Sequence, residues 1–247
     1  MIGMIDTHSH LLPAVDDGSR SIDESMELLR MCADDGVDIQ VLTPHYPDNI
    51  YGNSVEMLTI VFDNFKLAAA REGIDIQLEL AGEVKVSQDI VPLIQSDQFP
   101  WLGMWQGHKV FLMEFPFQRI TSGLINLVDW LSKKGIRPLI AHPERCAEIH
   151  NNINKIKPFL EAGCLLQITA GSLNGLFGKA VFDTGCELLK MCETPVIASD
   201  CHRLDSRPPG GLGDAAKVAA EVIGAKAAQA AVDDIPRKLV EGIKAFH

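Results

Sequence analysis

The sequence lacks the features that would place the chain in a membrane or on an export route. No apolar run of the 247-residue chain is long enough to cross a bilayer without interruption. The longest candidate, the alanine-rich stretch 214–232, carries Lys217, Glu221 and Lys226 at helical spacing, which predicts an amphipathic surface helix. The first residues lack the basic region and the long apolar run of a signal peptide. We therefore do not expect an integral membrane protein.

Basic residues and paired cysteine motifs are also scarce. Lys and Arg number 22 against 33 Asp and Glu, so the net charge is −11 and no long basic groove for nucleic acid is expected. A small anionic substrate is compatible with this balance, because bound cations can invert the local field. The six cysteines form no C-x-x-C motif, which predicts reduced thiols in a cytoplasmic protein.

Apolar residues, in contrast, are plentiful. They make up 47% of the chain, enough for a large buried core. The sequence has no internal repeat and no low-complexity linker. Because a barrel of about 250 residues commonly folds as one unit, we expect a single domain over residues 1–247.

Short apolar runs typical of buried strands alternate with longer helical patterns. The runs cover residues 4–7, 39–43, 76–81, 110–115, 137–141, 164–169 and 195–199. A capping box that begins at Ser21 predicts a helix to about Asp35, and Ser54 predicts the start of a second helix. Further helices are predicted at 121–134, 152–162, 179–192, 214–222 and 235–245. This order predicts a parallel α/β fold, and we favour a seven-stranded (β/α)7 TIM-like barrel over an open sheet.

Metal-capable side chains follow nearly every apolar run. They are His8 and His10, His45, Glu83, Glu114, His142, Asp200 and His202. The carboxyl ends of parallel strands share one face of a barrel, so we expect these side chains to converge. Only the sixth run, 164–169, has no such group.

Glu114 gives the sharpest of these signals, because apolar residues flank it on both sides. An unpaired carboxylate there would be strongly unfavourable, so we expect it to be neutralised, paired with a buried arginine or bound to a metal. Histidines and carboxylates without thiolates suit Zn, Fe or Mn, and oxygen-rich sites favour Mn. The adjacent pair Asp16 and Asp17 precedes Gly18 and, by itself, indicates a turn with an Asx cap.

One motif points to a different mechanism. Cys201 and Arg207 fit C-x5-R, the pattern of cysteine-based tyrosine phosphatases. That mechanism needs a loop of free backbone amides around the phosphate. Here no glycine separates the two residues, Asp205 would repel phosphate, and two prolines follow. We therefore interpret Cys201 as a small apolar spacer.

The motif set as a whole resembles the PHP (polymerase and histidinol phosphatase) superfamily. Within it, the chain is most similar to the bacterial protein-tyrosine phosphatases encoded beside capsule and exopolysaccharide genes. The matching stretches are MIDTHSHLLPAVDDGS, TPHY, AGEV, MEFP, LIAHPER, LLQITAGSLNGLFGK and IASDCHRLDSRPP. They run from residue 4 to residue 209.

This resemblance implies a distorted seven-stranded PHP-type barrel with three divalent ions at its mouth, Mn²⁺ being favoured over Fe or Zn. By position, the first ion would be held by His8, His10, Glu83 and Asp200. Glu83 would bridge to a second ion, completed by Glu114 and His142, and the third would be held by Asp17, His45 and His202. Arg145 and Arg207 match the two arginines expected to bind phosphate.

The resemblance also implies a reaction. A metal-bridging hydroxide would attack the phosphorus of phosphotyrosine on a protein, the substrate being the Tyr-rich tail of a bacterial tyrosine kinase that controls capsule or exopolysaccharide synthesis. The main alternative is a histidinol-phosphate or other small-molecule phosphatase of the same superfamily. An amidohydrolase is disfavoured because a glutamate stands where that group has a modified lysine. Phosphodiester chemistry on nucleic acids is disfavoured by the negative net charge. A non-catalytic docking module is disfavoured because every ligand position is filled.

Overall fold

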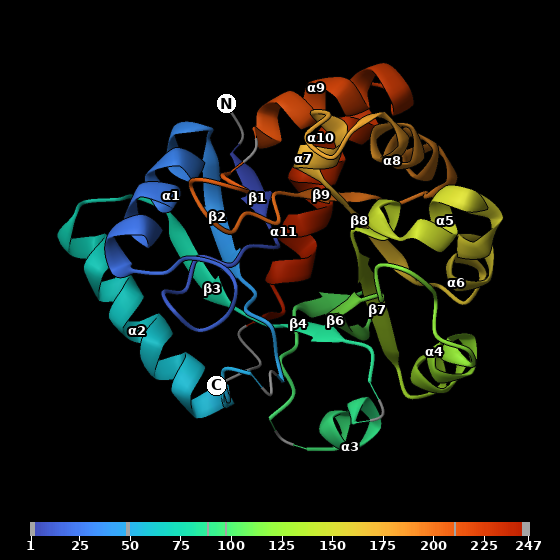
Figure 1. The fold of residues 1–247 in the computed structure, drawn as a ribbon, viewed down its shortest axis with the longest axis horizontal. Coiled ribbons are helices and arrows are strands. Elements are labelled where there is room, and N and C mark those ends of the chain that lie inside the picture. The colour runs from blue at the N-terminus through green and yellow to red at the C-terminus, as the bar shows by residue number, and fades with distance from the viewer. Residues whose placement is uncertain (1–2, 48–49, 88, 97, 210, 244–247) are drawn as a thin grey trace.

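Parallel strands form the centre of the computed structural model, which describes residues 3–47, 50–87, 89–96, 98–209 and 211–243 (Figure 1). One sheet has the order β1-β2-β3, with strands at Met4–Asp6, Val37–Leu42 and Gln77–Leu80. The other has the order β4-β6-β7-β8-β9, with strands at Glu83–Lys85, His108–Glu114, Ile136–Ala141, Leu165–Thr169 and Val196–Ala198. Neighbours along both orders pair in parallel. All seven predicted runs contain a strand, so the parallel α/β fold is confirmed.

The single closed sheet of seven strands that we predicted is not confirmed, because the described strands form two separate sheets. At one junction, between β1 and β9, only an isolated bridge joins Ser9 and Cys201. The Asp6 carboxylate takes the place of a strand partner there. It accepts hydrogen bonds from the Ser199 amide at 2.9 Å and from the Ser199 hydroxyl at 2.5 Å. The Asp6 side chain therefore links the two sheets at a place where we expected a continuous ladder of backbone hydrogen bonds.

At the other junction, an isolated bridge joins His45, which follows β2, to Glu83 at the start of β4. The chain bends at Gly82 between β3 and β4. A Cβ at this position would lie 2.8 Å from the Cβ of Pro100, so only glycine allows this close approach. The bend starts β4 at Glu83 and brings that carboxylate to the junction.

A short strand that we did not predict, β5 (Gly103–Trp105), pairs antiparallel with β6. Gln106 and Gly107 make the tight turn between them with φ angles of 49° and 81°. Gly103 has a φ of 146°, and a Cβ on it would come within 1.9 Å of the Leu239 carbonyl oxygen. Glycine is therefore required where the hairpin packs against a C-terminal helix.

Helices surround the strands (Figure 1). The α-helices are α1 (Ile22–Asp34), α2 (Val55–Arg71), α3 (Ile90–Ile94), α4 (Leu124–Lys133), α5 (Ala147–Asn151), α6 (Lys157–Glu161), α7 (Ala170–Leu173), α8 (Lys179–Met191), α9 (Leu212–Ile223), α10 (Ala225–Val232) and α11 (Asp234–Val240). Two 3₁₀ helices, η1 (Pro143–Arg145) and η2 (Ile153–Ile156), complete the described set.

The two predicted serine caps are confirmed. The Ser21 hydroxyl accepts a hydrogen bond from the Glu24 amide at 3.2 Å, and the Ser54 hydroxyl accepts one from the Met57 amide at 3.1 Å. The Glu24 carboxylate accepts from the amide of Arg20 at 2.9 Å, one residue before the cap. In both helices the serine hydroxyl therefore accepts a hydrogen bond from a first-turn amide that has no partner within the helix.

Three helix predictions need correction. The predicted helix 152–162 is divided into η2 and α6, because Pro158 has no amide hydrogen and can only occupy the first turn of a new helix. The alanine-rich stretch is divided into α9 and α10 at Gly224 (φ 85°), but its amphipathic character is confirmed, because Ala215 and Ala219 are buried while Lys217 is exposed. The helix predicted at 121–134 begins only at Leu124. The end of the helix predicted at 235–245 lies outside the described residues.

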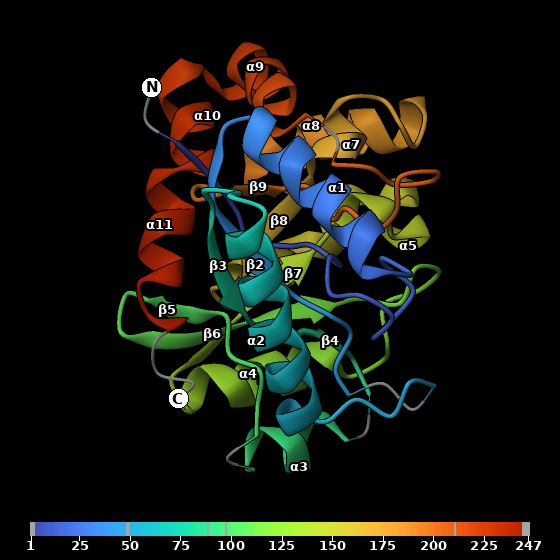
Figure 2. The same cartoon turned by 90° about the vertical axis from the view of Figure 1, so that its left-hand side faces the viewer.

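Two cores hold these layers together. A larger core fills the space between the strands and the surrounding helices. A smaller core lies inside the strands and includes Ile5, Val41, Leu112, Leu139, Leu165, Val196, Ile235, Leu239 and Val240. The last three of these belong to α11, which covers one end of the strands, while the loop of residues 8–20 lies at the other end (Figure 2). The C-terminal helices therefore pack on the strands, and the opposite end is left to the polar side chains.

Within the described residues, the helices are too short or too polar to traverse a bilayer.

Candidate metal centre

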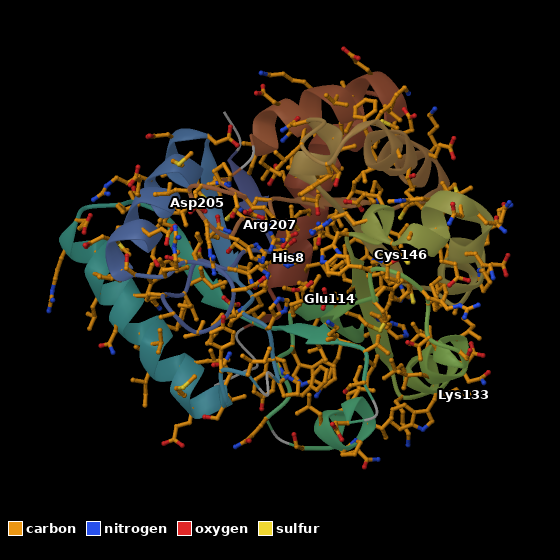
Figure 3. All side chains as sticks on the ribbon, viewed as in Figure 1. His8, Glu114, Lys133, Cys146, Asp205 and Arg207 are labelled. Atoms are coloured by element: carbon orange, nitrogen blue, oxygen red, sulfur yellow. The ribbon has the colours of Figure 1, made fainter. Side chains whose placement is uncertain are left out.

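The predicted ligands converge at the carboxyl ends of the strands. In Figure 3, His8, Glu114 and Arg207 lie around the middle of the molecule, whereas Lys133 lies at its edge. Each of the nine predicted ligands belongs to at least one cluster in which the ligand atoms lie within 4.8 Å of one another. They are His8, His10, Asp17, His45, Glu83, Glu114, His142, Asp200 and His202.

His8 and His10 follow β1 and present their Nε2 atoms to each other at 3.2 Å. The Nδ1 atom of His8 donates to Gln167 Oε1, and the Nδ1 atom of His10 donates to Asp16 Oδ2, each at 2.7 Å. Because both oxygens accept, both Nδ1 atoms carry the hydrogen, and in neutral rings both Nε2 atoms present lone pairs. Two facing lone pairs repel unless a proton or a cation lies near them.

Glu83 is the shared carboxylate of the cluster and is almost fully buried. Its oxygens lie 3.5 Å from His8 Nε2, 3.4 Å from His10 Nε2, 3.1 Å from His45 Nδ1 and 2.9 Å from His142 Nε2. Burial raises its pKa, but the surrounding histidines outweigh burial and hold the pKa well below the usual range. An ionised carboxylate with four imidazole neighbours fits a bridging ligand.

Asp200 has two oxygens with different neighbours. Its Oδ1 lies 3.3 Å from His8 Nε2 and 3.6 Å from His10 Nε2, and this buried oxygen has no hydrogen-bond partner. Its Oδ2 accepts from Arg145 at 2.5 Å and from Arg207 at 3.3 Å. An orphaned, ionised oxygen beside two imidazole lone pairs fits a divalent cation at this point.

Asp17, His45 and His202 form the more exposed edge of the cluster. One Asp17 oxygen lies 3.4 Å from the Nε2 atoms of both histidines. Burial lowers the pKa of His45, but Asp17 and Glu83 raise it to about 11. Burial and the nearby charge of His10 lower the pKa of His202 to about 4. Asp17, which sequence alone suggested to be a turn residue, thus faces two candidate ligands.

Glu114 and His142 occupy the opposite edge. Burial, followed by the charge of Glu83, raises the pKa of Glu114, and a bound cation would favour its ionised form. It clusters with His45 and Glu83, while His142 clusters with His8 and Glu83. Glu83 is the member that these two clusters share. His142 adopts a φ of 34° where β7 ends and η1 begins.

Arg145 and Arg207 lie beside the cluster and are partly exposed. The Arg145 guanidinium is held between two rings, with its Cζ 5.0 Å from the centre of Phe117 and 4.7 Å from that of Phe177. These contacts leave the N–H groups of the guanidinium able to donate hydrogen bonds. One of these groups donates to Asp200, next to the candidate ligands.

Cys201 does not face the cluster. Its side chain is fully buried and interacts with the thiol of Cys32, whose pKa is raised by that contact and by burial. Three amides of the loop are already used, because His202 and Arg203 donate to the Arg207 carbonyl and Arg207 donates to the Arg203 carbonyl. The loop therefore does not offer the free amides that a cysteine phosphatase requires.

Sequence reasoning missed several supporting residues. Asp16 orients His10, and Gln167 orients His8 from β8, the strand that carries no predicted ligand. The only signal for Gln167 was a polar residue in an otherwise apolar strand.

Glu144 is fully buried and accepts from the Thr169 amide at 2.9 Å and the Ser172 hydroxyl at 2.7 Å. It fixes η1, and with it Arg145, to the start of α7.

Comparisons with known proteins identify the family and the fold. The family model for capsular polysaccharide synthesis, CpsB/CapC, matches residues 4–241. The tyrosine-protein phosphatase YwqE of Bacillus subtilis is 31% identical over 204 residues, which cover 83% of this chain and 79% of that protein. The tyrosine-protein phosphatase CpsB of Streptococcus pneumoniae is 30% identical over 243 residues, covering 96% and 98% of the two chains. A crystal structure from work on YwqE and CpsB, described as metal-dependent tyrosine phosphatases, superposes with a TM-score of 0.82 at 28% identity, covering 98% of this chain and 94% of that one.

Proposed function

Because the chain belongs to the CpsB/CapC family of capsular polysaccharide synthesis, we propose that it is a metal-dependent protein-tyrosine phosphatase. The observation that carries the proposal is the pair of Nε2 atoms of His8 and His10, 3.2 Å apart, with the orphaned Oδ1 of Asp200 beside them. A divalent ion between them would satisfy all three atoms at once.

We propose three divalent ions, with Mn²⁺ favoured by the oxygen-rich donor set. The clusters support one ion at His8, His10 and Asp200, one at Asp17, His45 and His202, and one around Glu83. Glu114 and His142 lie on either side of Glu83 and complete the third group. The chemistry that such ions supply is a water whose pKa is lowered towards about 7, and hence a hydroxide at neutral pH.

Arg145 and Arg207 are the proposed catalytic residues that bind the phosphoryl group. Their guanidinium groups meet at the outer oxygen of Asp200, so both can donate to one phosphate held next to the metal ligands. Arg145 gains precision from the rings of Phe117 and Phe177, which fix its plane. The charged N–H groups of the two arginines can donate to the non-bridging oxygens of the phosphoryl group and balance their negative charge in the transition state.

The proposed substrate is a phosphotyrosine on a protein, in particular the Tyr-rich tail of a bacterial tyrosine kinase in capsule or exopolysaccharide synthesis. A phenolate leaving group has a pKa of about 10 and needs little protonation, in keeping with a site whose acids are occupied as ligands. We place this reaction in the cytoplasm, and the six cysteines as free thiols support that location. Both sheets contribute ligands, which supports one catalytic domain over residues 1–247.

The experiment is hydrolysis of p-nitrophenyl phosphate and of a phosphotyrosine peptide, before and after exhaustive chelation. Turnover should disappear with the metal and return when Mn²⁺ or a related ion is added. Asp200→Ala should lose both metal and turnover, whereas Asp183→Ala, which removes an exposed carboxylate on α8, should keep both. Full activity in protein shown by elemental analysis to be metal-free would refute the proposal. A strong preference for histidinol phosphate would instead favour the small-molecule alternative.

A further inference from the structure

A cavity of about 310 Å³ opens directly onto the candidate metal ligands. Asp17, His45, Glu83 and Glu114 form its polar part. The volume lies at the low end of the roughly 300–1,000 Å³ typical of small-molecule sites, so it suits one aromatic side chain better than a large ligand. The cavity therefore lies where the group attached to a bound phosphate would project.

The other side of this cavity is mainly apolar and aromatic. It is lined by Tyr46, Pro47, Ile50, Tyr51 and Phe117, together with Lys85. Among the described residues, eight large apolar side chains are strongly exposed, and three of them, Ile50, Tyr51 and Phe117, line this one cavity. Exposed apolar side chains gathered beside polar catalytic groups are typical of a ligand site.

Phe117 is held in place although it is 41% exposed. Its ring is stacked on the His142 ring with 14° between the planes and 5.7 Å between the centres, and Arg145 packs against it. Phe117 follows β6, and Tyr51 belongs to the loop between β2 and α2, so the two walls come from different sheets. The cavity is therefore lined by two aromatic residues that come from different parts of the fold.

We propose that Phe117 and Tyr51 form an aryl subsite, which binds the phenyl ring of the substrate while its phosphate contacts the metal ligands and arginines. This inference rests on the proposed phosphatase function and specifies its selectivity. The ring of phosphotyrosine spans the cavity and can pack edge-to-face or offset against the walls. Phosphoserine has the same methylene group but no ring between it and the phosphate oxygen. To bring its phosphate to the same place, the peptide backbone would have to enter the apolar cavity and lose hydrogen bonds to water.

The test compares kcat/KM for two peptides of identical sequence that carry either phosphotyrosine or phosphoserine. Tyr51→Ala should lower kcat/KM for the phosphotyrosine peptide by about tenfold, mainly through KM, and leave the phosphoserine peptide unchanged. Phe117→Ala should lower kcat/KM for both peptides, and more for the phosphotyrosine peptide, because Phe117 also contacts Arg145. Tyr51→Phe should retain the wild-type preference. Ile60→Ala, which removes an apolar side chain of similar exposure on α2, should behave like the wild type.

Tyr51→Ala is the deciding variant, because Phe117 also packs on Arg145 and its loss could disturb phosphate binding. Equal losses for both peptides in Tyr51→Ala, with unchanged metal content and melting temperature, would overturn the aryl subsite, and so would no loss at all. If the wild type hydrolyses neither peptide, the phosphatase proposal fails, and the subsite is then tested by calorimetry with a peptide carrying a non-hydrolysable phosphonate analogue of phosphotyrosine. Tyr51→Ala should bind that peptide about tenfold more weakly, and equal affinity would refute the subsite.

Discussion

The substitution Asp16→Asn tests the claim that the cluster is built to hold metal, without touching a candidate ligand. One Asp16 oxygen accepts from His10 Nδ1 at 2.7 Å and from the His45 amide at 3.1 Å, and the other accepts from the Gly18 amide at 2.9 Å. Asparagine has one carbonyl oxygen and one NH₂ group. The NH₂ group must therefore face either the Gly18 amide or the His10 ring.

Either orientation weakens the site. If the NH₂ group faces His10, the ring must accept at Nδ1 and carry its hydrogen on Nε2, the atom expected to bind the ion. If it faces Gly18, two donors oppose each other and the turn is strained. Loss of such a supporting carboxylate typically lowers metal affinity about 10- to 100-fold, which corresponds to about 1.4–2.7 kcal/mol.

The assay is a titration of chelator-treated protein with Mn²⁺ in competition with a chromophoric chelator, combined with elemental analysis. Asp23→Asn, an equivalent change at an exposed position in the first turn of α1, serves as the control and should bind like the wild type. Affinity of Asp16→Asn within about twofold of the wild type would refute the role given to Asp16. An equal loss in Asp23→Asn would show that the effect is not specific to the site.

Three further predictions concern the arginines, the thiol and the fold. Arg145→Ala and Arg207→Ala should keep their metals and lose about 1.5–3 kcal/mol of transition-state binding. This loss corresponds to a roughly 10- to 150-fold lower kcat/KM. Wild-type kinetics in both variants would leave the phosphate-binding role of the arginines unsupported. Cys201→Ser should retain most activity, and a loss of about three orders of magnitude with metals intact would restore the cysteine mechanism. Metal removal should lower the melting temperature, because one ion at about 100 times its dissociation constant adds about 2.7 kcal/mol; identical melting curves for verified apo and holo protein would contradict convergent carboxylates.

The order of elements could be predicted from the sequence because buried parallel strands have continuous apolar runs. All seven runs proved to contain strands, and the serine caps located the starts of α1 and α2. Closure of the sheet could not be predicted, because it depends on side chains at the junctions. Asp6 replaces a ladder by bonding to Ser199, and no periodicity signals such a substitution. The three-residue strands β4 and β5 were too short to show any alternation.

Eight of the nine candidate ligands could be predicted because they follow apolar runs, whereas Asp17 was implied only by the family resemblance. Their supporting residues could not, since Asp16 resembles an ordinary turn residue and also acts as one, through its bond to the Gly18 amide. Gln167 could be noticed only as a polar residue in a buried strand, and its partner His8 is 159 positions away. Contacts over such separations depend on the strand order, which a single sequence specifies only indirectly.

Asp200 connects the two halves of the proposed mechanism. Its Oδ1 faces the Nε2 atoms of His8 and His10, and its Oδ2 faces Arg145 and Arg207. Burial disfavours the charged form, but the surrounding histidines, His8 first, hold the pKa of Asp200 well below the usual range, so the carboxylate is ionised at neutral pH. One charge therefore anchors both a metal ligand set and the phosphate-binding arginines. Because the two sets share this carboxylate, a phosphate held by the arginines would lie beside the candidate metal ligands, and ions bound by those ligands would supply a hydroxide close to the phosphorus.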